Sequence, residues 1–116
     1  MFVAYVIVTV IAIVVNVAIT VADLVRAEFV VANSTKVGVP TSWIPWLAVP
    51  KAAGAAGLLL GLMGVPFIGM AAALGLVLFF VGAVTVHIRA RVFHNLAFPG
   101  VFLGLAIASL VLSAVR

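Results

Sequence analysis

The side chains best suited to chemistry are a lysine, an aspartate and a histidine set in or beside long apolar segments. Lys51, Asp23 and His87 supply a basic, an acidic and an imidazole group. A Lys–Asp pair beside an imidazole could transfer protons in a dry site, so these three residues are the catalytic candidates. The same groups equally suit a static ion-pair network that holds helices in register.

Other chemistries have less support. The chain has no cysteine, which excludes disulfides, thiol nucleophiles and thiolate metal ligation. No HExxH-type metal spacing and no glycine-rich phosphate loop is present, so we expect no metal site. His87 and His94 could ligate haem, but both stand on one helix, whereas haem in a bundle normally draws on facing helices. We expect no cofactor.

A line of polar side chains follows the first apolar segment. At about 100° per residue of a helix, Tyr5, Thr9, Asn16, Thr20 and Asp23 fall on one narrow stripe. The rest of that segment is apolar. The stripe must therefore face the interior of a helix bundle or a cavity rather than lipid.

Lys51 follows Trp46 by five residues, and tryptophan is typical of the membrane–water interface. At 1.5 Å per residue, Lys51 lies about 7–8 Å deeper in the membrane. We expect an inward-pointing lysine paired with Asp23 or Asn16. The alternative is a lysine that extends back to the interface.

The ends of the expected helices bring the ionisable groups to one membrane face. That face is expected to hold Asp23, Glu28, Lys51, His87, Arg89, Arg91 and His94. If the third helix continues far enough, His87, Arg91 and His94 share one side of it. We predict a one-sided polar pocket that continues down the stripe. Its expected ligand-binding residues are Tyr5, Thr9, Asn16, Thr20, Trp43, Trp46, Arg91 and Phe102.

The composition restricts the class of protein that positions these groups. Of 116 residues, 68% are hydrophobic and 7% are charged, against about 45–50% and about 25% in soluble domains. Such a chain is neither a soluble globular domain nor disordered. The net charge of +4 does not indicate nucleic acid, because six cations spread over several membrane segments cannot form one phosphate-binding face. The expected partner is the lipid bilayer.

Hydrophobic stretches predict an all-α integral membrane four-helix bundle. The helices are expected at about 1–31, 44–64, 66–92 and 95–115, within one domain spanning 1–116, because a spanning helix needs about 20 apolar residues. We read the first as a retained helix rather than a cleaved signal peptide. Residues 23–43 read as a polar loop. The break at Gly64-Val65-Pro66 separates the second and third helices, since Pro disfavours helix geometry in the residue before it.

Glycines mark the faces on which the helices pack. Gly54, Gly57, Gly61 and Gly64 follow one face of the second helix, and Gly100, Gly104 and Ala108 form a similar ladder on the fourth. Small residues let helices approach closely in lipid, where no hydrophobic force drives them together. These faces exceed what one bundle needs, so we expect a homo-oligomer or a membrane-protein partner.

Basic residues predict the orientation. Arg26, Lys36, Arg89 and Arg91 belong to the first and third loops, against Arg116 on the other side. By the positive-inside rule, loops 1 and 3 are expected in the cytoplasm and both termini outside.

Three stretches carry a family resemblance: Pro45 to Gly54 (PWLAVPKAAG), Gly57 to Gly61 (GLLLG) and Gly82 to His87 (GAVTVH). With the four-helix layout, they resemble the DoxX-like family of small bacterial membrane proteins. The resemblance implies that Lys51 and His87 are the family's lysine and histidine positions, and that the protein lies in the bacterial inner (plasma) membrane. The family is similar to a subunit of thiosulfate–quinone oxidoreductases.

Two functions remain open on the sequence. The size and the glycine faces favour an accessory subunit of a membrane complex. The alternative is a membrane-embedded enzyme or carrier that acts by acid–base chemistry on a lipophilic small molecule such as a quinone, an isoprenoid or a sterol-like lipid. An ion channel fits less well, because the polar residues fade before the far membrane face.

Overall fold

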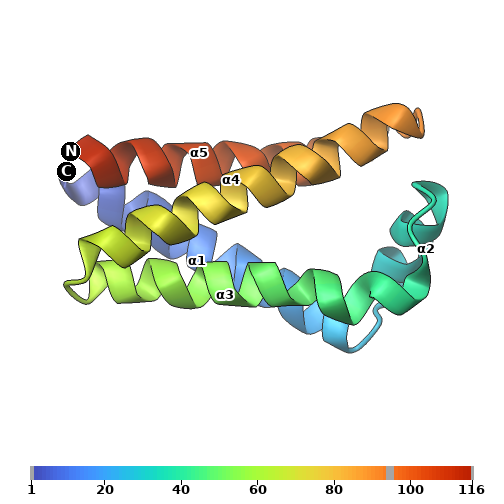
Figure 1. Cartoon of the computed structure of the whole chain (residues 1–116), viewed down its shortest axis with the longest axis horizontal. Helices are drawn as coiled ribbons and strands as arrows, with labels where there is room; N and C mark the ends of the chain where they lie inside the picture. The colour runs from blue at the N-terminus through green and yellow to red at the C-terminus, as the bar shows by residue number, and fades with distance from the viewer. Residues whose placement is uncertain (1, 94–95, 116) are drawn as a thin grey trace.

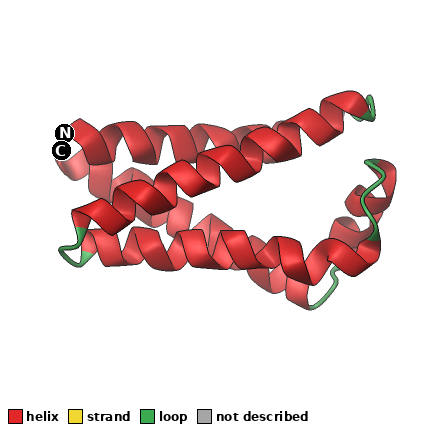
Figure 2. Ribbon diagram, in the orientation of Figure 1, coloured by secondary structure: helices red, strands yellow, loops and turns green. Residues whose placement is uncertain are grey.

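The computed structural model describes residues 2–93 and 96–115. Within these ranges the chain forms α-helices, one short 3-10 helix (η1) and turns (Figure 2). The elements are α1 (Phe2–Leu24), α2 (Glu28–Lys36), η1 (Thr41–Trp43), α3 (Ile44–Leu62), α4 (Pro66–Arg89) and α5 (Ala97–Val115). The expected all-α membrane class is confirmed, because α1, η1 with α3, α4 and α5 are each long and apolar enough to span a membrane.

The four long helices form a ring. α1 packs on α3, α3 on α4, α4 on α5, and α5 closes the ring on α1. α1 begins and α5 ends at one end of the molecule, and α2 lies at the other (Figure 1). The longest dimension is 39 Å, which suits a hydrocarbon core about 30 Å thick. We call the end near the start of α1 the closed end and the end near α2 the open end.

Close contact between α3 and α4 seals the closed end. A Cβ atom added to Gly61 would lie 2.7 Å from the Cα of Gly69, so the two backbones touch. Gly54 and Gly57 also face α4, where an added Cβ would meet the side chains of Leu76 and Ala72. The turn between the helices runs through Gly64, whose φ of +108° strongly favours glycine. The predicted glycine face of the second helix is confirmed for Gly54, Gly57 and Gly61.

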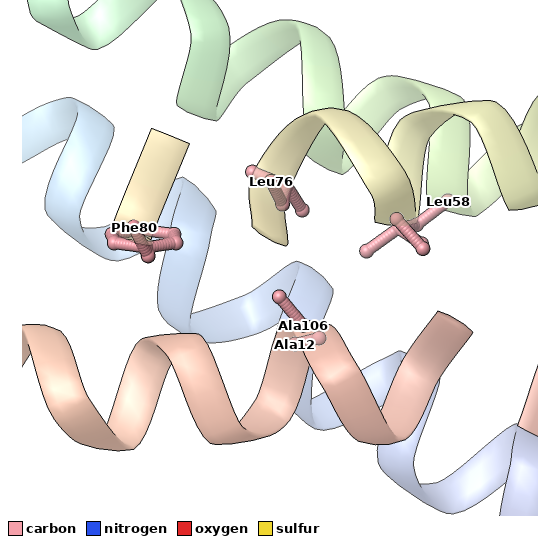
Figure 3. Packing of buried hydrophobic residues seen from close by; sticks show 6 residues of the cluster. Ala12, Leu58, Leu76, Phe80 and Ala106 are labelled. Carbon is pink, nitrogen blue, oxygen red and sulfur yellow. The ribbon is translucent and has the colours of Figure 1, made fainter. Parts of the chain in front are cut away.

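Small and branched side chains fill the centre of the ring (Figure 3). Ala12 of α1, Leu58 of α3, Leu76 and Phe80 of α4 and Ala106 of α5 form one buried cluster. Each has at most 3% of its surface exposed. This apolar layer lies between the Gly61–Gly69 contact and the cavity, whose wall Phe80 also forms.

The first helix is shorter than the sequence suggested. The expectation of a helix to residue 31 is wrong: α1 ends at Leu24, and the polar segment expected to be a loop contains α2. Arg26 adopts a left-handed backbone with φ of 52°, and the Ala27 amide donates to the Ala22 carbonyl at 3.0 Å. This is the hydrogen-bond pattern of a helix end. It turns the chain so that a new helix begins at Glu28.

The third helix also ends early. α4 stops at Arg89 rather than at residue 92, because Arg91 has a left-handed φ of 57° and the Val92 amide donates to the His87 carbonyl at 3.0 Å. Arg91 therefore does not continue the helical face of His87. His94 and Asn95 lie outside the described residues, and α5 is described from Ala97.

Candidate functional site

Lys51 and Asp23 form a buried ion pair between α3 and α1. The Lys51 ammonium donates to Asp23 Oδ2 at 2.5 Å. Their side chains are 11% and 4% exposed, so the lysine does not extend to the surface. Of the two expected partners, Asp23 is the one that the structure shows.

The ammonium of Lys51 also lies over an aromatic ring of a third helix. Its Nζ is 5.4 Å from the centre of the Phe79 ring on α4. A cation over an aromatic face is attracted to the ring's negative surface. The lysine therefore connects α1, α3 and α4 at the open end. Within the part of the chain that the structure describes, its ammonium makes one hydrogen bond and keeps further N–H donors.

His87 stands in the last turn of α4 and is buried. Its Nδ1 lies 2.8 Å from the Ala83 carbonyl, and its Nε2 lies 3.0 Å from Asn33 Oδ1 on α2. Both ring nitrogens thus have a polar partner, so the ring is held between α4 and α2. A neutral ring satisfies the same contacts if the Asn33 amide is turned so that its nitrogen donates to Nε2.

Asp23, Lys51 and His87 border one cavity of about 660 Å³ at the open end. Its remaining walls come from α2 with its following loop, the start of α3, the end of α4 and the start of α5. The volume falls within the range of small-molecule sites. Aromatic side chains contribute much of the apolar lining: Phe29, Trp43, Phe79, Phe80 and Phe98. The structure therefore joins the three catalytic candidates around one hollow.

The part of the polar stripe nearer the closed end does not reach this cavity. Tyr5, Thr9 and Asn16 are buried on the inner face of α1, whereas the α1 lining consists of Ile19 and Asp23. Thr20 donates to the Asn16 carbonyl at 2.7 Å and borders a smaller hollow of about 300 Å³ between α1 and α3. The cavity is confined to the open end.

Of the remaining ligand-binding candidates, Trp43 lines the cavity, whereas Trp46, Arg91 and Phe102 do not. Trp43 lines the cavity although it is 55% exposed, whereas Trp46 is 76% exposed and does not line it. Arg91 is exposed beyond the end of α4 and is absent from the lining. Phe102 lies behind the wall, where its ring stacks on Phe98 with centres 5.1 Å apart.

Asn33 and three aromatic residues were missed by sequence reasoning. Asn33 lies in α2, which read as a loop, so nothing in the pattern pointed it at His87. Phe29, Phe79 and Phe98 resemble ordinary lipid-facing residues in an apolar sequence. Only the three-dimensional arrangement brings them to the same hollow.

Three buried polar atoms are left without a hydrogen-bond partner among the described residues. They are Thr9 Oγ1, Asn16 Oδ1 and Ser109 Oγ. The Asn16 amide nitrogen donates to the Ala12 carbonyl at 2.8 Å, so only its oxygen lacks a partner. Unpaired polar groups are costly in a membrane interior. The stripe is thus only partly satisfied within the bundle.

The geometry supports acid–base and hydrogen-bonding chemistry toward a ligand in the cavity. Lys51 can donate hydrogen bonds or a proton, Asp23 holds the ammonium in place, and His87 presents a titratable ring. Within residues 2–93 and 96–115, no three His, Asp or Glu side chains come close enough to share a metal ion.

Together these features define a small integral membrane protein built on four spanning helices, with a cavity at one end. The chain belongs to the DoxX-like family, which it matches over residues 7–109. The match covers Asp23, Lys51 and His87, and it confirms the resemblance seen in the sequence. Comparison with curated proteins gave no match, and comparison with solved structures gave none.

Proposed function

We propose that the protein binds a lipophilic small molecule in the open-end cavity and acts on it as a carrier or as an acid–base enzyme. The observation that supports this proposal most directly is the hollow of about 660 Å³ into which Lys51, Asp23 and His87 all open. A purely structural ion pair needs no adjoining cavity. A ligand that is mostly apolar would fill the aromatic walls and present its polar group to Lys51.

The test begins with protein purified gently from its own membranes. Mass spectrometry of the extracted lipids should find a lipophilic molecule in the wild type that is lost from Lys51→Ala. Because that variant leaves Asp23 unpaired, a second variant keeps the ion pair. Gly82 lines the cavity, and a Cβ added there meets nothing within 4 Å. Gly82→Phe should therefore place its ring in or beside the cavity and reduce the amount of bound molecule.

Gly75→Phe is the matched control for Gly82→Phe. Gly75 lies two helical turns earlier on the same face of α4, is equally open, and does not line the cavity. It should retain the bound molecule at the wild-type level. The same lipids in all four proteins, wild type included, would contradict the proposal.

A second candidate function is an accessory subunit of a membrane complex. It is favoured by the exposed glycines of α5: Cβ atoms added to Gly100 and Gly104 would meet nothing within 4 Å. Glycine weakens a helix by about 1 kcal/mol relative to alanine, so an unused glycine pair calls for a helix from another chain. That chain is a partner protein or a second copy.

The accessory role is tested by purification in mild detergent. A partner should co-purify in fixed stoichiometry with the wild type and be lost from Gly100→Leu/Gly104→Leu. Self-association should show as a larger particle by light scattering, reduced in the same variant. A free monomer in both proteins would contradict this second function.

We further propose that the protein lies in a bacterial inner membrane with the open end in the cytoplasm. Supporting this, Arg26, Lys36, Arg89 and Arg91 all belong to the segments at the open end (Figure 1). The chain lacks cysteine, so labelling of an introduced cysteine reports the accessibility of that position alone. In intact cells, an impermeant maleimide should label Met63→Cys, in the turn at the closed end, but not Thr35→Cys on α2. The reverse pattern would overturn the orientation.

A further inference from the structure

The charges that surround the cavity restrict the head group of its ligand. This inference rests on the proposed binding function. Four ionisable side chains line the hollow: Asp23, Lys36, Lys51 and His87. Lys36 is exposed, whereas Asp23 and Lys51 are at most 9% exposed as whole residues. His87 is buried as well, but each of its ring nitrogens already faces a partner, Ala83 or Asn33. The buried groups left to meet a ligand are thus one positive and one negative charge held 2.5 Å apart.

Such a pair is nearly neutral to an approaching ion. A carboxylate drawn to the Lys51 ammonium is repelled by Asp23 beside it, and an amine drawn to Asp23 is repelled by Lys51. Either ion also loses its water shell among apolar walls, at a cost that only a full opposite charge could offset. The pair therefore gives little advantage to a charged head group.

The pair is better suited to bind an uncharged oxygen acceptor. The Lys51 ammonium has three N–H donors, and the structure uses one of them for Asp23. A carbonyl oxygen can accept a charge-assisted hydrogen bond from a remaining donor without disturbing the ion pair. Its desolvation cost is small compared with that of an ion.

We propose that the cavity selects amphiphiles with an uncharged carbonyl head group, which accepts a hydrogen bond from Lys51, over carboxylates and amines of the same chain length. Asp23 is then a specificity-determining residue: it neutralises the lysine and so excludes anions. The apolar body of the ligand lies against the aromatic walls, which include Phe79 and Phe80.

The experiment is a scintillation-proximity binding assay on the purified full chain with tritiated octadecan-2-one. Unlabelled octadecan-2-one, octadecanoate and octadecylamine compete for the site. In the wild type, the ketone should compete at concentrations about tenfold lower than either ion, because only the ions lose a full hydration shell and meet a like charge in the pair. Asp23→Asn leaves the lysine uncompensated and should shift the ratio about tenfold toward octadecanoate.

The ratio compares the inhibitory concentrations of octadecan-2-one and octadecanoate within one variant. A lower folded fraction therefore does not alter it. Arg89→Gln removes a charge from the same end of the molecule outside the cavity and should leave the ratio unchanged. A wild-type preference for octadecanoate or octadecylamine, or a ratio unaffected by Asp23→Asn, would overturn the head-group inference.

Failure of the head-group inference can be told from failure of the proposed function. The head-group inference is contradicted if an ion binds more tightly than the ketone, or if none of the three compounds binds saturably. The extraction experiment with Gly82→Phe and Gly75→Phe judges the cavity without assuming any head group. If the extracted molecule carries a carboxylate, phosphate or amine, the inference fails and the proposed function stands.

Discussion

The two ends of the bundle differ in how their helices are held together. At the closed end, glycines let the backbones of α3 and α4 touch, so Gly61 and Gly69 leave no room for even a methyl group. At the open end, aromatic and ionisable side chains hold the helices around a cavity of about 660 Å³. Close packing fixes the relative positions of the helices at one end. The other end depends on a few polar contacts around the cavity.

The largest expected effect is at the open end. Lys51→Met leaves the Asp23 carboxylate buried without its cation, which should lower the free energy of unfolding by about 3 kcal/mol. Unfolding in mixed micelles by increasing SDS, followed by circular dichroism, measures the change. Lys51→Met/Asp23→Leu removes both charges and should recover most of the loss. If the double variant is no more stable than the single one, the pair is not what holds the open end together.

The closed end is tested by Gly61→Ala. The new methyl group would lie 2.7 Å from the Gly69 Cα, so α3 and α4 must separate, with an expected loss of about 2 kcal/mol. Gly104→Ala adds the same methyl group where nothing lies within 4 Å and should be neutral or slightly stabilising. The same SDS titration compares them. Equal effects would mean that backbone contact does not distinguish the closed end.

A gain in stability is expected from removing an unpaired buried hydroxyl near the closed end. Thr9 is fully buried and its hydroxyl has no hydrogen-bond partner among the described residues. Thr9→Val keeps the shape and removes the unpaired group, so stability should rise by about 1 kcal/mol. Thr85→Val is the control, because that exposed hydroxyl already donates to the Val81 carbonyl at 2.7 Å. A clear loss at Thr9→Val would show that this hydroxyl has a partner within the membrane.

The smallest effect concerns the helix ends at the open end. Arg91 adopts a left-handed backbone that glycine adopts at lower cost. Arg91→Gly should therefore raise the melting temperature in detergent slightly, by the equivalent of about 0.5 kcal/mol. Arg89→Gly, at the last residue of α4, should lower it slightly, because Arg89 has no positive φ and glycine is the poorer helix former. If both variants are destabilised alike, the backbone of Arg91 is not strained.

The long apolar segments were predictable because a bilayer requires them. Their composition predicted four spanning helices, and the spacing of Gly54, Gly57 and Gly61 predicted a close-packed face. An inward Lys51 paired with Asp23 or Asn16 was also predicted from the sequence, and the structure shows Asp23 as the partner.

The missed features depend on backbone conformations that arginine does not signal. Glycine at position 64 marks a turn, but Arg26 and Arg91 also take a positive φ, without any sequence indication. Because the turn at Arg26 was invisible, α2 was missed, and with it the contact between Asn33 and His87. The apolar layer around Ala12 and Phe80 was equally hidden, so the pocket was expected to continue down the polar stripe.

The closure of the ring by its first and last helices has a consequence for biosynthesis. α3 and α4 are neighbours in sequence, joined by a tight turn, and can pair as soon as both leave the ribosome. α1 also requires α5, which is made last. Until then, the side of α1 that packs on α5 faces lipid or the insertion machinery. We expect a nascent chain truncated before α5 to remain bound to that machinery, and crosslinking of stalled chains would show whether α5 releases it.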